Sequence, residues 1–133
     1  MKILSTKLHG LIDYVLAGAM ICTPFIMSHD FTLATTIILM VGGCAMLLNS
    51  LGTNYEFGIF RNISMKDHLR IDACIAMMIC LLPIFFRFDY YKIPLLYGTL
   101  LFMLSIVTHK TAYFKMFHGI TYRKFEKFPS YRY

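Results

Sequence analysis

Two histidine–aspartate pairs are the residues of this chain whose types and spacing are best suited to chemistry. His9 precedes Asp13 by four positions, and His68 precedes Asp72 by the same interval. Residues four apart lie on one face of a helix, so each pair would present an imidazole beside a carboxylate. Such groups relay protons, bind cations or form strong hydrogen bonds in a low-dielectric interior.

Each pair belongs to a longer pattern that occurs twice at one constant offset. The first copy is Ser5, Lys7, His9, Ile12, Asp13, Ala17 and Pro24, and the second is Ser64, Lys66, His68, Ile71, Asp72, Ala76 and Pro83. The segments that follow match more loosely, with Gly42 opposite Gly98 and Asn49 opposite Ser105. The sequence therefore predicts an internal duplication.

Four apolar segments hold these patterns, at roughly residues 7–27, 33–51, 68–86 and 93–108. A helix of about 20 apolar residues crosses the hydrocarbon core of a bilayer. The chain of 133 residues is 58% hydrophobic and only 15% charged, and a soluble domain of this size has too small an interior to bury so much apolar side chain. We predict an all-α membrane protein with four transmembrane helices.

The duplicated unit contains an even number of spans, so both copies keep the same orientation in the membrane. We predict two parallel helical-hairpin repeats, at about 5–56 and 64–109, related by an axis along the membrane normal. They form a four-helix domain over 1–109, followed by a tail over 110–133. The two His–Asp faces should then meet between the hairpins, with both aspartates turned inward.

Basic residues gather on one side of the four predicted spans. That side holds Lys2, Lys7, Arg61, Lys66, Arg70, Lys110, Lys115, Arg123, Lys124, Lys127 and Arg132, and the other side holds Arg87 and Lys92. The positive-inside rule places both termini and the middle loop in the cytoplasm, so the predicted location is an inner (cytoplasmic) membrane. Attraction to anionic lipid accounts for the net charge of +6 without nucleic acid.

The tail alternates aromatic residues with lysine and arginine, which is typical of a segment lying at the membrane interface. Its predicted contacts with lipid headgroups are Lys115, Arg123, Lys124, Lys127 and Arg132.

Intramembrane polar groups are expected to form one cluster, because an unpaired charge in a membrane segment is costly. Its predicted members are His9, Asp13, His68, Asp72, Asn49, Ser105 and His109. In one interpretation the cluster joins the hairpins through hydrogen bonds. In the other it relays protons, although the polar path stops halfway across the bilayer. The paired histidines could also ligate haem or a divalent metal, but their position near the helix ends leads us to predict no cofactor and no metal.

Four segments together resemble a known family. They read HGLIDY at 9–14, TPF at 23–25, TNYEFG at 53–58 and MKDHLRID at 65–72. They are similar to the SPW repeat integral membrane proteins of bacteria, and the resemblance implies two repeats and four helices without an established activity. The eponymous tripeptide differs, because Pro24 and Pro83 are followed by Phe25 and Ile84 and the chain has no tryptophan. Pro24, Phe25 and Pro83 form the corresponding helix-end motif.

The sequence contains no hydrolase, nucleotide-binding or HExxH motif, so it does not predict an enzyme. We predict a structural or accessory subunit of a membrane assembly, in contact with lipid and forming a homo-oligomer or part of a larger complex. The alternative is a small proton- or ion-linked transporter that uses the Asp and His pairs.

Overall fold

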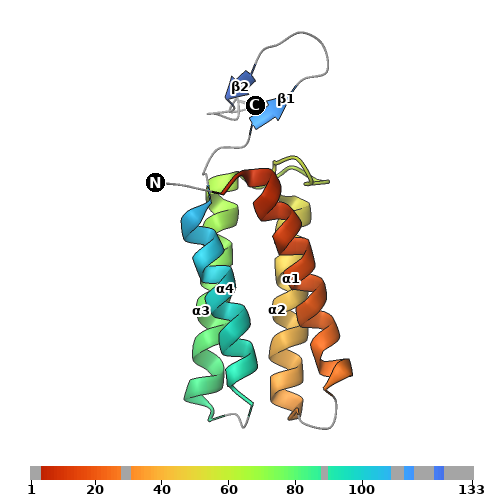
Figure 1. Cartoon of the computed structure of the whole chain (residues 1–133), viewed down its shortest axis with the longest axis vertical. Helices are drawn as coiled ribbons and strands as arrows, with labels where there is room; N and C mark the ends of the chain where they lie inside the picture. Colours follow the sequence, from red (N-terminus) through yellow and green to blue (C-terminus); the bar gives the residue numbers. More distant parts are fainter. Residues whose placement is uncertain (1–3, 28–30, 88–89, 109–112, 116–121, 125–133) are drawn as a thin grey trace, which may run out of the picture.

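The computed structural model describes residues 4–27, 31–87, 90–108, 113–115 and 122–124. Its four helices are α1 (Thr6–Ile26), α2 (Leu33–Gly52), α3 (Met65–Phe85) and α4 (Lys92–Val107). Figure 1 shows them side by side along the long axis as two hairpins, α1 with α2 and α3 with α4. The first hairpin joins the second mainly through packing of α2 on α3. The four-helix architecture is therefore present.

Helices α1, α2 and α3 are long and apolar enough to cross a membrane. Helix α4 is apolar but has 16 residues, which is roughly 24 Å at 1.5 Å per residue. Many large apolar side chains point out of the bundle, including Leu11, Val15, Val41, Leu48, Met78, Leu81, Leu100 and Met103. An outer surface of this kind is suited to lipid rather than to water.

Side-chain caps set where three of the helices begin. The Ser5 hydroxyl accepts from the amide of Leu8 at the start of α1, and Thr32 caps α2 in the same way. Ser64 accepts from the Asp67 amide at 3.2 Å and donates to the Asp67 carboxylate at 2.6 Å. This cap, which the Ser-x-x-Asp pattern of residues 64–67 predicts, starts α3 at Met65, three residues before the start of the apolar segment.

An apolar core fills most of the bundle. It consists of Ala17, Met20, Leu39, Met46, Ala76, Ile79 and Leu101. One glycine in each hairpin lets its two helices approach closely. A β-carbon on Gly43 would stand 2.9 Å from the Ala17 carbonyl oxygen, and one on Gly98 would stand 2.8 Å from that of Ala76. Gly43 thus makes the contact that corresponds to Gly98, whereas the sequence comparison placed Gly42 opposite Gly98.

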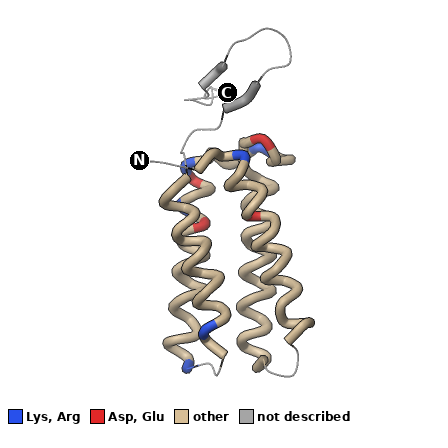
Figure 2. Tube along the Cα trace, viewed as in Figure 1, with Lys and Arg blue, Asp and Glu red and all other residues tan. Residues whose placement is uncertain are grey.

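Charged residues gather near the two ends of the helices (Figure 2), whereas the buried Asp13 and Asp72 lie within α1 and α3. More of them lie at the end that carries the α2–α3 loop than at the opposite end. At the charged end, Leu4 pairs with Thr108 and Thr53 pairs with Ile63 in isolated parallel bridges. The chain therefore enters α1 and leaves α4 at the same end of the bundle.

The tail contains two short strands, β1 (Tyr113–Lys115) and β2 (Tyr122–Lys124), which pair antiparallel. Of the predicted headgroup contacts, Lys115 lies in β1, and Arg123 and Lys124 lie in β2. Lys127 and Arg132 lie outside the described residues.

Candidate functional site

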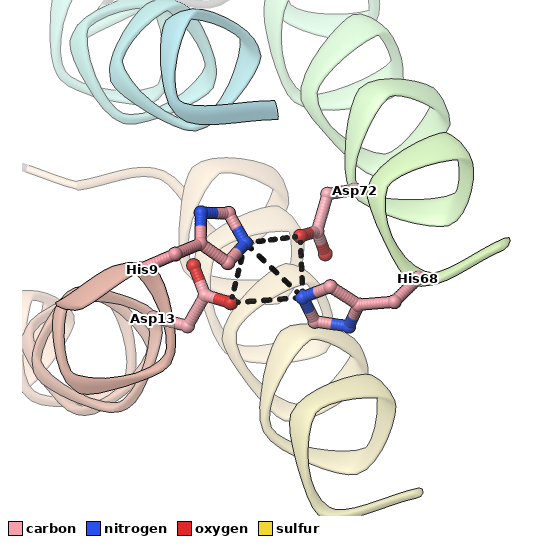
Figure 3. Close-up of side chains that lie close together, drawn as sticks. All are labelled: His9, Asp13, His68 and Asp72. Carbon is pink, nitrogen blue, oxygen red and sulfur yellow. Dashed lines mark hydrogen bonds and ion pairs between the residues drawn. The ribbon is translucent and has the colours of Figure 1, made fainter. Parts of the chain in front are cut away.

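Four side chains converge between the hairpins at the charged end of the bundle. His9 and Asp13 come from α1, and His68 and Asp72 come from α3 (Figure 3). We call these four residues the histidine–aspartate centre. Both histidines are 0% exposed and both aspartates 1% exposed. The two aspartates therefore turn inward, as the duplicated pattern predicts.

The facing atoms of the centre are all close together. The Nε2 atoms of His9 and His68 are 3.2 Å apart. Asp13 Oδ2 lies 3.1 Å from both Nε2 atoms. Asp72 Oδ2 lies 3.1 Å from His68 Nε2 and 3.4 Å from His9 Nε2. Each carboxylate thus contacts the histidine of its own helix and that of the other hairpin.

Local structure explains this convergence. Each His–Asp pair spans one helical turn, so imidazole and carboxylate project from the same face. The pairs begin near the capped starts of α1 and α3, where the helix dipole favours negative charge. Since both helices start at the same end of the bundle, the two polar faces meet at one level.

A threonine just after each hairpin orients one imidazole. The Thr53 hydroxyl lies 2.9 Å from His68 Nδ1 and donates to the Asn49 carbonyl at 2.6 Å. The Thr108 hydroxyl lies 2.9 Å from His9 Nδ1 and donates to the Leu104 carbonyl at 2.7 Å. A hydroxyl has one proton to donate, so each threonine accepts its second bond from an Nδ1–H. This network assigns the proton of each neutral imidazole to Nδ1 and leaves the Nε2 lone pair facing the centre.

Residues of α2 hold the two carboxylates. Asn49 Nδ2 donates to Asp72 Oδ1 at 2.8 Å and to the His68 carbonyl at 3.2 Å. The Ser50 hydroxyl donates to Asp13 Oδ2 at 3.3 Å. Two buried carboxylate oxygens of the centre, Asp13 Oδ1 and Asp72 Oδ2, accept no hydrogen bond within the described part of the chain. The centre therefore has more acceptors than donors.

The α2–α3 loop covers the centre. Tyr55 is fully buried, with its ring 5.9 Å from that of His68. It packs directly on Gly10, where a β-carbon would overlap the tyrosine ring. Burial raises the pKa of the Tyr55 phenol above its ordinary value, so the phenol stays neutral. The Thr6 hydroxyl donates to the Glu56 carboxylate at 3.0 Å and fixes the loop to α1.

The structure places the other predicted site residues as follows. Asn49 joins the centre, whereas the Ser105 hydroxyl donates to the Phe102 carbonyl of its own helix at 2.8 Å. His109 lies outside the described residues. Pro24 and Pro83 are buried in the last turns of α1 and α3, and Phe25 points outward with 69% exposure.

Sequence reasoning missed Ser50, Thr53, Tyr55 and Thr108 as partners of the centre. A signal was present, because Thr53 and Thr108 each occupy the position immediately after a helix. Ser50 precedes Thr53 by three positions, and Ser105 precedes Thr108 by the same interval. The comparison of the two halves had aligned Asn49 with Ser105 and so left this Ser-x-x-Thr correspondence out of register.

The chemistry open to the centre is binding of a cation or of protons. Among the described residues, His9, Asp13, His68 and Asp72 bring one ligand atom each within 4.8 Å of one another. Haem does not fit between the histidines, because their Nε2 atoms are 3.2 Å apart. Two axial nitrogens at bond lengths of about 2.0 Å stand about 4 Å apart, with a flat macrocycle between them.

Comparisons of the chain with protein families, with curated proteins and with solved structures found no match. The resemblance to the SPW repeat proteins stays a prediction. Function is therefore inferred from the geometry of the centre and from the surface of the bundle.

Proposed function

We propose that this chain is an integral membrane protein in which the histidine–aspartate centre locks two hairpins together, and that it serves as a structural or accessory subunit. The observation that carries the proposal is the contact of each buried carboxylate with an imidazole of the other hairpin, at 3.1 Å for Asp13 and 3.4 Å for Asp72. Separation of the hairpins would leave these carboxylates and imidazoles without hydrogen-bond partners in an apolar medium, which costs free energy.

The surface supports the membrane location. Three helices have the length and composition of spans, and the exposed faces are apolar. Ile59 and Phe60 of the α2–α3 loop are 68% and 65% exposed, close in sequence to Arg61 and Lys66. Apolar side chains beside cations are typical of a segment that touches the headgroup region. The excess of basic residues supports a cytoplasmic location for this loop in a bacterial inner membrane.

Corresponding contacts support a duplication with parallel halves. His9 and His68 each contact a threonine that follows a helix. Gly43 and Gly98 each approach the carbonyl of an alanine from the repeated pattern. Kinship with the SPW repeat proteins is proposed from the sequence motifs alone. The outward apolar faces would be covered by lipid, by a second copy of the chain or by other subunits.

A proton- or ion-linked transporter is the second candidate, because buried ionisable groups in a membrane segment often mark a transport path. The core beyond the centre is formed by apolar side chains. In the half of the bundle away from the centre, Thr23 and Tyr97 form a polar contact at 2.7 Å. That contact is far short of a continuous chain of proton carriers, so the locking role is favoured.

Proton flux and stability measured together separate the two candidates. The full-length protein is placed in vesicles containing a pH-sensitive dye, and Asp13→Asn is compared with Asp67→Asn, which changes an exposed aspartate. Wild-type vesicles should leak protons no faster than protein-free vesicles, and Asp13→Asn alone should lower the unfolding temperature. A wild-type flux that Asp13→Asn abolishes at unchanged unfolding temperature would favour the transporter.

A further inference from the structure

We propose that the histidine–aspartate centre binds one divalent transition-metal ion, for which zinc is the probe of choice. The proposal deepens the locking role and rests on it, because a metal held by both helices would join the two hairpins directly. The ligands would be His9 Nε2, His68 Nε2, Asp13 Oδ2 and Asp72 Oδ2.

Most of the spacings among these atoms are close to those of a site with four ligands around one ion. Zinc binds imidazole nitrogen and carboxylate oxygen at about 2.0–2.1 Å, so neighbouring ligand atoms of a tetrahedron stand about 3.3 Å apart. Asp13 Oδ2 lies 3.1 Å from the Nε2 atoms of both histidines, and Asp72 Oδ2 lies 3.1 Å from His68 Nε2. The two other distances involving His9 Nε2 are 3.2 Å to His68 Nε2 and 3.4 Å to Asp72 Oδ2. Five of the six spacings among the ligand atoms are thus close to those around one ion, and all four atoms lie within 4.8 Å of one another.

The hydrogen bonds around the two imidazoles also favour a cation at the centre. Thr53 and Thr108 leave the Nε2 lone pairs of the neutral imidazoles pointing inward. In the neutral imidazoles those lone pairs face two carboxylate oxygens, so the four electron-rich atoms repel one another until a cation or protons enter the centre. Protonation of both imidazoles would place two cations 3.2 Å apart at their Nε2 atoms. A single divalent ion satisfies all four lone pairs at once.

Charge and donor type define the class of ion. Two carboxylates balance a 2+ charge, so the loaded centre is neutral, as a buried site requires. Imidazole favours zinc, iron, nickel and copper, whereas calcium and magnesium prefer sites built from oxygen atoms. Four protein ligands in tetrahedral arrangement leave no open position, which is typical of a structural site.

The surroundings have the support that metal ligands require. Each imidazole donates through its other nitrogen to a threonine, and Asn49 holds the outer oxygen of Asp72. Such partners fix the orientation of a ligand, and their loss typically weakens binding 10–100-fold. Tyr55 closes the centre from the loop side.

The test uses the full-length protein, purified in detergent through a tag without histidines and without chelators. Its metal content is measured, the metal is stripped with a chelator, and Zn²⁺ or Co²⁺ is added back. We expect one metal ion per chain, visible bands of tetrahedral Co²⁺, and an unfolding temperature that rises with added Zn²⁺ but not with Mg²⁺.

Variants locate the site. His9→Ala and Asp72→Asn should lose stoichiometric Zn²⁺ and the Co²⁺ bands. Thr108→Val keeps all four ligands and should bind Zn²⁺ about 10–100-fold more weakly, which provides a test even where a ligand variant does not fold. The matched controls are His29→Ala and Asp67→Asn, and both should bind as the wild type does.

Three results would overturn the metal site. They are wild-type protein that takes up neither Zn²⁺ nor Co²⁺, ligand variants that bind like the wild type, and controls that lose the ion together with the ligand variants. The locking role has a separate readout. If no metal binds but Asp72→Asn still unfolds at a lower temperature than the wild type, the metal site fails and the lock stands.

Discussion

Asparagine in place of Asp72 is expected to lower the free energy of unfolding by about 3–5 kcal/mol, the typical cost of removing one partner from a buried ion pair. The substitution keeps the shape of the side chain but removes the charge that faces His9 and His68. When the centre holds a positive charge at the Nε2 atoms, an amide nitrogen turned toward it is repelled, and one turned outward meets the Asn49 donor. Unfolding by denaturing detergent in mixed micelles measures the change.

Asp67→Asn is the matched control for this prediction. Asp67 lies on the same helix, but its carboxylate is exposed and pairs with Arg70 at 2.9 Å on the surface. Exposed pairs and first-turn contacts such as that of Asp67 with Ser64 contribute little, so this variant should lose much less stability than Asp72→Asn. Equal losses for the two variants would show that Asp72 acts as an ordinary surface charge and that the centre does not hold the hairpins together.

Alanine at Gly43 or Gly98 should destabilise the bundle by about 1–3 kcal/mol, the usual cost of forcing extra atoms into a packed interior. At both positions the new β-carbon would meet a backbone carbonyl, that of Ala17 or that of Ala76. A backbone atom cannot swing aside as a flexible side chain does, so the two helices of the hairpin must separate. The unfolding experiment used for Asp72 measures this effect.

Gly18→Ala tests the same chemical change in open space. A β-carbon at Gly18 would have no neighbour within 4 Å, and the residue lies inside α1. Alanine is favoured over glycine in a helix by roughly 0.5–1 kcal/mol, so this variant should be more stable than the wild type. Opposite signs at Gly18 and Gly98 support close helix contact at Gly98. The same sign at both positions contradicts it.

Much of the fold follows from the sequence because lipid and helix geometry impose simple rules. Apolar segments of about 20 residues predict the helices, and the structure has helices at all four places. The shared face of His9 and Asp13 follows from helical periodicity, as does that of His68 and Asp72. The start of α3 follows from the Ser-x-x-Asp cap at residues 64–67, whereas hydropathy alone places it near residue 68.

The residues that contact the centre were harder to predict from the sequence, because their positions depend on packing between helices. Ser50 reaches Asp13 only when α2 lies against α1 in one register, and Thr53 reaches His68 only when the end of α2 lies against α3. Thr108 contacts His9 across 99 positions of sequence, and Tyr55 is buried by the path of a loop. Neither spacing nor composition specifies such long-range contacts. The direction of a lone pair, which carries the metal proposal, requires the whole hydrogen-bond network.

The most direct test of the central claim is a double-mutant cycle between Asp13 and His68. Their facing atoms are 3.1 Å apart although the residues are 55 positions apart, on different hairpins. The unfolding free energies of wild type, Asp13→Asn, His68→Ala and the double variant are compared. A shared centre predicts a coupling energy of about 1–3 kcal/mol, within the range found for residues in contact. Losses that add within about 0.5 kcal/mol would show that the two side chains do not interact and would contradict the account.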